Sequence, residues 1–214
     1  MAVARYRDRH SIAGRKSDHG DAVVLANILR TGLHAHRPLP AGTELAQAIA
    51  VLARAQQDTV WARTQAHNKL RSHLREYFPG FLAAFADARG GITRPEARVI
   101  LAAAPTPAAA GKLTLAQLKA LVKNAGRRRG IDAEAARLRD AFRAPQMRQL
   151  PLAEQAMGRQ AQALLRQLDA ACDSASDLEQ AAIESFNQHP DAGIITSFPG
   201  LGPLTGARVL AETG

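Results

Sequence analysis

The sequence holds 214 residues, with 28 Lys and Arg against 19 Asp and Glu and a net charge of +9 at pH 7. This length suits one large domain or two small ones, and the basic balance makes nucleic acid or another anionic surface the partner to consider. The single cysteine, Cys172, excludes an internal disulfide and a cysteine metal cluster, and every apolar stretch is broken well short of the roughly 18 residues of a membrane span.

Helix signals run through almost the whole chain, because Ala and Leu abound and no run of alternating β-branched residues is convincing. An all-α fold is therefore predicted. The first helix is expected over about residues 18–31, where Ser17 or Asp18 can cap its start and Gly32 can end it. A linker containing Pro38-Leu39-Pro40 follows.

A long helix is expected to open at Thr43 and Glu44 and to reach about Tyr77, because Pro79-Gly80 stops it. Apolar residues near one stripe of this helix are Leu45, Ile49, Leu52, Ala66 and Leu70. Polar side chains interrupt the stripe at Gln56, Thr59 and Arg63. The lone tryptophan, Trp61, is expected to pack in a helical interface.

Four shorter helices are expected next, over about residues 81–88, 94–104, 114–124 and 132–143. Turn-forming residues separate them at Gly90-Gly91, at Pro105-Thr106-Pro107 and from Gly126 to Gly130. The prediction is a small helical cluster.

A second long helix is expected from about Leu152 to Phe186. Apolar residues recur there in alternating steps of four and three, at Met157, Ala161, Leu164, Leu168, Ala171, Ala175, Leu178 and Ala182. This heptad pattern predicts a coiled-coil arm, in which small side chains favour close packing of two helices. The partner is either the first long helix of the same chain or a second subunit, which would make the protein a homo-oligomer, and the pattern does not choose between them.

An acidic pair lies at the start of the first predicted helix, in Lys16-Ser17-Asp18-His19-Gly20-Asp21-Ala22. Helix positions three apart lie roughly 60° from each other, so Asp18 and Asp21 project from one side and can share a cation. Mg²⁺ prefers carboxylate oxygens, and such ions serve phosphodiester chemistry. The alternative is a purely structural role, in which Asp18 caps the helix and Asp21 interacts with its positive end. Spacing alone favours this structural role over metal binding.

The segment Lys16–Leu25 resembles the signature K-[ST]-D-x-x-D-A-x-x-L-A, which closes the RuvC-like domain of transposases of the insertion sequence 110 family. Further matching segments cover nearly the whole chain: Arg37-Pro38-Leu39, Asn68-Lys69-Leu70-Arg71, Leu74–Gly80, Ala104–Pro107 and Phe198–Pro203. The resemblance implies that Asp18 and Asp21 are catalytic and metal-binding, as the last two carboxylates of a DEDD site for Mg²⁺-dependent DNA cleavage and strand transfer.

The same resemblance implies that the first Asp and the Glu of the site belong to a strand-rich region preceding this chain, and that an attacking serine lies beyond it. The chain is therefore expected to be truncated at both ends, to lack most of the RuvC-like core and to be inactive alone. The expected domains are a RuvC-like remnant over residues 1–40, a helical and coiled-coil region over 41–190, and the start of the second transposase domain over 191–214. A guide RNA partner is implied only by the resemblance.

Phosphate contacts are expected at both ends of the chain. The segment around Phe198-Pro199-Gly200-Leu201-Gly202-Pro203 looks like a helix-hairpin-helix element, in which Gly200 and Gly202 expose backbone amides to a phosphate and Arg208 lies nearby. An ordinary turn between two helices is the alternative. Residues 1–78 hold 12 Lys and Arg against 6 Asp and Glu, so Arg15 and Lys16 are expected to contact nucleic acid as well.

These observations predict a DNA transposase fragment from the bacterial cytoplasm, associated with the nucleoid and with no membrane partner. Two other functions fit parts of the sequence. Basic charge and the heptad pattern would equally suit a non-enzymatic helical module for nucleic-acid binding or dimerisation, and the acidic pair would suit a RuvC-like nuclease without strand transfer. A stand-alone module need not combine Asp18-x-x-Asp21 with the C-terminal hairpin, which argues against both.

Overall fold

The computed structural model describes residues 18–32, 42–86 and 90–213, without the side chains of Asp18, Asp21 and Thr213. The chain forms two compact units, Met1–Ala41 and Gly42–Gly214. Within the described residues every regular element is a helix and none is a strand, so the predicted all-α fold is confirmed.

The first unit contains helix α2 (Asp18–Gly32), which begins and ends where the sequence predicted. Near its end the Thr31 hydroxyl donates to the carbonyl of Asn27 at 2.7 Å. Of the large apolar side chains in α2, Val24 is buried, whereas Val23, Leu25 and Leu29 are each about half exposed.

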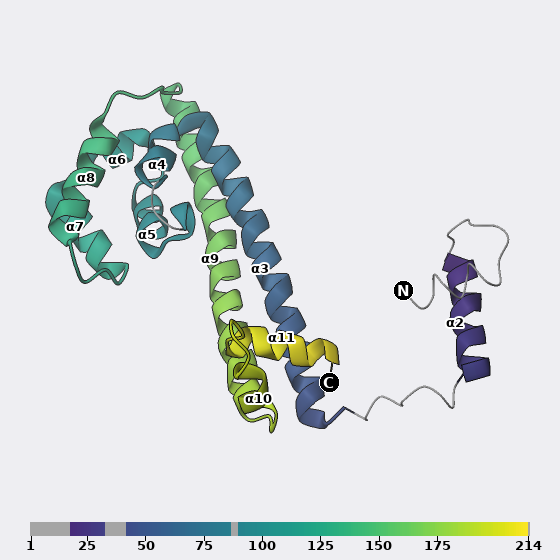
Figure 1. Ribbon diagram of the computed structural model, residues 1–214. Coiled ribbons are helices and arrows are strands. Elements are labelled where there is room, and N and C mark those ends of the chain that lie inside the picture. Colours follow the sequence, from purple (N-terminus) through teal and green to yellow (C-terminus); the bar gives the residue numbers. More distant parts are fainter. Residues whose placement is uncertain (1–17, 33–41, 87–89, 214) are drawn as a thin grey trace. The chain divides into compact units, whose positions relative to one another are not determined.

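Two long helices dominate the second unit (Figure 1). Helix α3 (Glu44–Tyr77) and helix α9 (Pro151–Asn187) lie side by side and run in opposite directions, and together they are called the arm here. The side chain of Thr43 caps α3 by accepting a hydrogen bond from the Ala46 amide at 3.1 Å. Because the partner of α9 within this structure is α3, the arm is an intramolecular helical hairpin.

The buried residues of α9 follow a heptad pattern, at Glu154, Gly158, Ala161, Leu165, Leu168, Ala175, Ala182 and Phe186. Half of the predicted positions are buried as expected, at Ala161, Leu168, Ala175 and Ala182. The other half are only partly buried, at Met157, Leu164, Ala171 and Leu178. Next to Met157 and Leu164 the buried residue is the following one, Gly158 or Leu165, and Glu154 is buried before the predicted pattern begins. Glu154 and Gly158 give no hydrophobic signal.

Helix α3 shows a similar shift. Ile49, Ala66 and Leu70 are buried as predicted, but Ala46 and Ala53 are more buried than the neighbouring Leu45 and Leu52. Small residues at these positions let the backbones of two helices approach closely, which the larger leucines would prevent.

Between α3 and α9 the chain forms a helical insert. Its helices are α4 (Pro79–Ala84), η2 (Gly91–Thr93), α5 (Pro95–Ala103), α6 (Pro107–Lys112), α7 (Leu115–Asn124) and α8 (Ile131–Arg143). Helix α6 was missed because Pro105-Thr106-Pro107 looked like a separator. In fact Thr106 caps α6 by accepting from the Ala109 amide at 3.1 Å, and Pro107 occupies the first turn, where no amide is needed.

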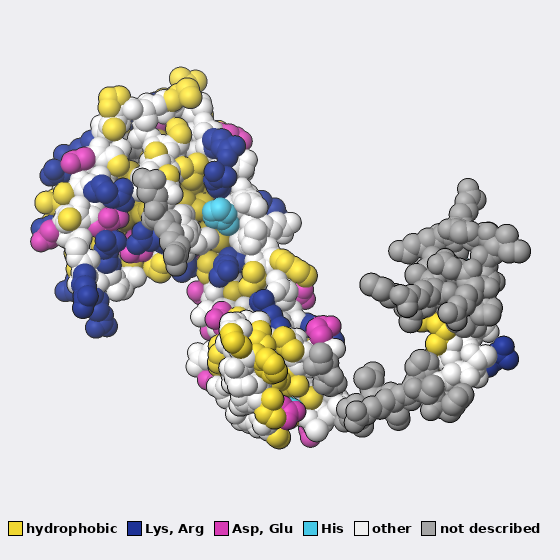
Figure 2. Space-filling view, in the orientation of Figure 1, with side chains coloured by type: hydrophobic (Ala, Val, Ile, Leu, Met, Phe, Trp, Pro, Cys, Tyr) yellow, Lys and Arg dark blue, Asp and Glu magenta, His cyan; other side chains and the backbone are white. Residues whose placement is uncertain are grey.

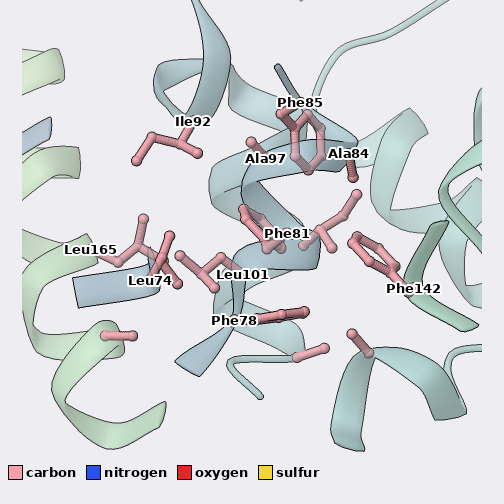
Figure 3. Close-up of a cluster of buried hydrophobic side chains, with 14 of the residues drawn as sticks. Leu74, Phe78, Phe81, Ala84, Phe85, Ile92, Ala97, Leu101, Phe142 and Leu165 are labelled. Atoms are coloured by element: carbon pink, nitrogen blue, oxygen red, sulfur yellow. The ribbon is translucent and has the colours of Figure 1, made fainter. Parts of the chain in front are cut away.

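Aromatic rings form the centre of the insert (Figure 3). The rings of Phe81 and Phe142 stack with 5.8 Å between centroids, and Phe78 and Phe85 each lie within about 5.3 Å of Phe81. Burial of each ring contributes roughly 1.5–3 kcal/mol. Since Leu74 of α3 and Leu165 of α9 belong to the same cluster, the insert is fixed to the arm by a continuous core.

At the other end of the arm lie α10 (Ala192–Thr196) and α11 (Pro203–Thr213), called the base here (Figure 1). A second core of buried side chains joins them to the arm: Ile49, Phe186, Ala192, Ala207 and Leu210. Among the described residues no helix is both long and apolar enough to cross a bilayer.

Candidate metal and nucleic-acid sites

The acidic pair lies in the first turn of α2, since Asp18 is the first residue of that helix and Asp21 follows one turn later. Helical spacing still predicts that both lie on the same side of the helix axis. Their side chains lie outside the described part of the chain. Carboxylates suit Mg²⁺ as hard oxygen donors, although a two-metal centre needs more ligands than these two supply.

The side chains that the structure does describe offer no further metal centre. Among them no group of three or more His, Cys, Asp or Glu is arranged to hold a metal ion. Cys172 packs against the core of the arm, and burial raises the pKa of its thiol, which disfavours the thiolate that metals bind.

The predicted hairpin glycines lie between α10 and α11. Gly200 has φ +85°, a conformation that L-residues rarely adopt, so glycine is required there. The carbonyl of Gly202 accepts the first hydrogen bond of α11, from the Gly206 amide at 2.8 Å. A Cβ added at either Gly200 or Gly202 would meet nothing within 4 Å, so the turn is open to an approaching ligand.

Arg208 of α11 makes a contact that the sequence did not predict. Its Nη2 donates to Oε1 of Gln56 at 2.5 Å, across 152 residues of sequence. Gln56 is only 1% exposed, and its partner explains why a polar residue interrupts the apolar stripe of α3. Arg208 is partly exposed and lines a surface hollow, so this contact leaves part of the side chain accessible.

Trp61 corrects another prediction, because its side chain is 64% exposed and does not pack in a helical interface. It borders a hollow of about 340 Å³ between α3 and α11, whose other lining residues include Arg54, Gln57, Arg208 and Glu212. Trp61 lies outside the buried stripe of α3, which is why its side chain is exposed.

Of the other predicted contacts, Arg15 and Lys16 lie outside the described residues. Many arginines of the insert have carboxylate partners. Arg94 pairs with Glu96 at 2.8 Å, and Arg137 pairs with Glu134 at 2.8 Å. These pairs are structural contacts within the insert, so a high arginine count alone does not mark a nucleic-acid site there.

The chain was compared with known proteins. The family model of IS110-type DEDD transposases, described as "Transposase", matches residues 1–79. Over all 214 residues the chain is 63% identical to a Streptomyces coelicolor protein named "Mini-circle putative transposase for IS117", of which it covers 52%.

A shorter similarity extends over 78 residues, 36% of this chain, and is 35% identical to "Putative transposase y4uE" of Sinorhizobium fredii, of which it covers 22%. The chain thus spans about half the length, or less, of these two relatives. No solved structure matches it.

Proposed function

Because the chain belongs to the IS110 family of transposases, we propose that it serves DNA transposition, with Asp18 and Asp21 as metal ligands of a DNA-cleaving and strand-transferring centre. The observation that carries this proposal is the placement of both aspartates in the first turn of α2, inside the segment that the family model matches. Acting on DNA would place the protein beside the chromosome in the bacterial cytoplasm.

Two carboxylates are half of the proposed site. Magnesium bound there would polarise phosphodiester oxygens and stabilise the attacking and leaving oxygens in the reaction. In this proposal the remaining Asp and Glu of a DEDD set, and a nucleophilic serine, belong to other segments of an intact transposase.

The proposed partner is DNA, held by its phosphates at the Gly200–Gly202 turn and at Arg15, Lys16 and Arg208. A guide RNA is a further part of the proposal that rests on the family alone. A homo-oligomer formed through the coiled-coil arm is another part, and it rests on the heptad pattern of α9. The second candidate is a non-enzymatic module for nucleic-acid binding. It is favoured by the arm, whose heptad core is complete within this chain and needs no catalytic centre.

Metal binding and cleavage distinguish the two candidates. We expect the purified chain to bind Mn²⁺, used as a paramagnetic substitute for Mg²⁺, and we expect Asp18→Asn with Asp21→Asn to abolish that binding. The same chain should not nick plasmid DNA, because the ligand set is incomplete. If the double substitution leaves Mn²⁺ binding unchanged, the two aspartates are not the metal ligands. Metal-dependent nicking that Asp21→Asn abolishes would show that the site is complete as it stands.

A further inference from the structure

One face of α3 carries basic and aromatic side chains without acidic ones. No Asp or Glu occurs between Asp58 and Glu76. Trp61, Asn68, Arg71 and Arg75 are all exposed, and their spacing of seven, three and four residues puts them on one side of the helix. These four residues are called the α3 outer face.

The arginines of this face differ from those of the insert. None of the described carboxylates pairs with Arg71 or Arg75, whereas Arg98 pairs with Asp169 at 2.7 Å and Arg148 pairs with Glu154 at 2.7 Å. Like charges four residues apart destabilise a helix, here between Arg71 and Arg75. A bound anion would remove that repulsion, so the face is arranged for an anionic ligand.

In Figure 2, Lys and Arg side chains are spread over the insert and the adjoining part of the arm, whereas hydrophobic side chains gather around α10 and α11. Since Arg71 and Arg75 lie in the half of α3 next to the insert, they belong to the basic part of the arm.

Trp61 adds an aromatic platform to this face. Its indole is 64% exposed and borders the hollow of about 340 Å³ between α3 and α11. That volume lies at the lower end of the range for small-molecule sites, about 300–1,000 Å³, and the hollow is also lined by Gln57, by Arg54 and by two carboxylates, Asp58 and Glu212, of which Glu212 pairs with Arg54 at 3.5 Å. A flat aromatic surface beside hydrogen-bonding groups suits a planar heterocycle.

A second hollow lies further along the same helix. It has a volume of about 330 Å³ and is lined by His67 and Arg71 of α3 and by Leu82, Gly91 and Ile92 of the insert. From Trp61 to Arg75 the helix rises by about 21 Å, at about 1.5 Å per residue. The face is therefore long enough for several nucleotides.

We propose that the α3 outer face binds single-stranded DNA, with an unpaired base stacked on Trp61 and phosphates held by Arg71 and Arg75. The proposal rests on the proposed function, in which the chain handles DNA. Stacking requires an unpaired base, because the faces of bases in a duplex are covered by their neighbours, and an exposed aromatic side chain near basic ones is typical of single-strand sites. This site does not include the turn at Gly200 and Gly202, but its hollow is also lined by Arg208, which belongs to the proposed duplex contact.

The single tryptophan makes the test direct, because all indole fluorescence comes from Trp61. A thymidine oligonucleotide of about 15 residues should quench that fluorescence, and a blunt duplex should not. In anisotropy measurements with a labelled oligonucleotide, Trp61→Ala should weaken binding at least about fivefold. Circular dichroism should show the variant folded, since the side chain is exposed.

The charge contribution has a matched control. Arg71→Gln with Arg75→Gln should weaken binding and lower the slope of log affinity against log salt by about 1.4, which is about 0.7 per phosphate contact on a single strand. Arg159→Gln with Arg166→Gln removes the same charge from exposed positions of α9. This control should leave the affinity and the salt slope nearly unchanged.

Either of two fluorescence results would overturn the proposal: no quenching of Trp61 by the oligonucleotide, or equal quenching by the duplex. Two binding results would do the same: an equal loss of oligonucleotide affinity in the two double-arginine variants, or binding of the matching RNA but not of the DNA. Duplex binding that persists by anisotropy in any of these cases would leave the proposed function standing. If the chain does not bind duplex DNA but the oligonucleotide still quenches Trp61 fluorescence, the duplex contact is wrong and the single-strand site is supported.

Discussion

Among the glycines of the base and of the turn before α11, Gly206 has the least room for a side chain. A Cβ at this position would lie 2.6 Å from Cζ of the buried Phe186 and 3.2 Å from Cγ2 of Ile195. Gly206→Ala should therefore destabilise the fold by about 1–3 kcal/mol through overpacking, visible as a lower melting temperature. Gly193→Ala in α10 is the control, because its Cβ would meet nothing within 4 Å, and an equal loss there would refute the packing argument.

Tyr77 predicts a response to alkaline pH. Its hydroxyl donates to the Pro105 carbonyl at 2.6 Å, and burial, together with the charge of Glu154, raises the pKa of Tyr77. Because the pKa is raised in the folded state, this contribution to stability is full below the unfolded pKa of about 10 and is lost as pH rises above it.

Spectroscopic titration of tyrosine checks this. We expect the late-ionising tyrosine to be absent from Tyr77→Phe, and the stability difference between the two proteins to shrink above about pH 10. Ionisation of both tyrosines of the wild-type protein near pH 10, with the fold intact, would contradict it.

At the scale of elements, the arm depends on the buried stripe of α9. Leu168 is fully buried there, so Leu168→Asp would place an unpaired charge in the core and should cost more than about 3 kcal/mol. Leu152→Asp in the first turn of the same helix changes an 81% exposed side chain and should cost little. Denaturant titration compares them, and similar midpoints would show that the stripe is not the core of the arm.

Helix boundaries were largely predictable because their signals are local. Thr43, Gly32 and Pro79 determine helix ends through their own backbone chemistry. The register of the arm was only half predictable, because Gly158 lies in the buried stripe, where its missing side chain leaves room for Thr106 of the insert. A hydrophobic pattern cannot detect a glycine that is buried by a close approach of backbone.

The candidate sites divide in the same way. The positions of Asp18 and Asp21 in one helical turn follow from local spacing and a short motif. The Arg208–Gln56 hydrogen bond joins residues 152 apart, so only the packing of α11 on the arm reveals it. The lack of acids between Asp58 and Glu76 was visible in the sequence, but it gained meaning only when Trp61 proved to be exposed.

The whole chain contains a segment that matches the transposase family and carries the acidic pair, and a helical hairpin that folds within one chain. The net charge of +9 and the proposed turn contacts both act on phosphates rather than on bases. Binding of duplex DNA should therefore depend strongly on salt and weakly on sequence.

DNA binding through the phosphate backbone is tested by measuring the affinity of the chain for two unrelated DNA duplexes at several salt concentrations. We expect a slope of log affinity against log salt of roughly −0.9 per phosphate contact, several units in total, with similar affinities for both duplexes. Gly202→Val and Arg208→Ala should weaken both duplexes about equally. A flat salt dependence, or strong discrimination between the duplexes, would contradict DNA binding through the phosphate backbone.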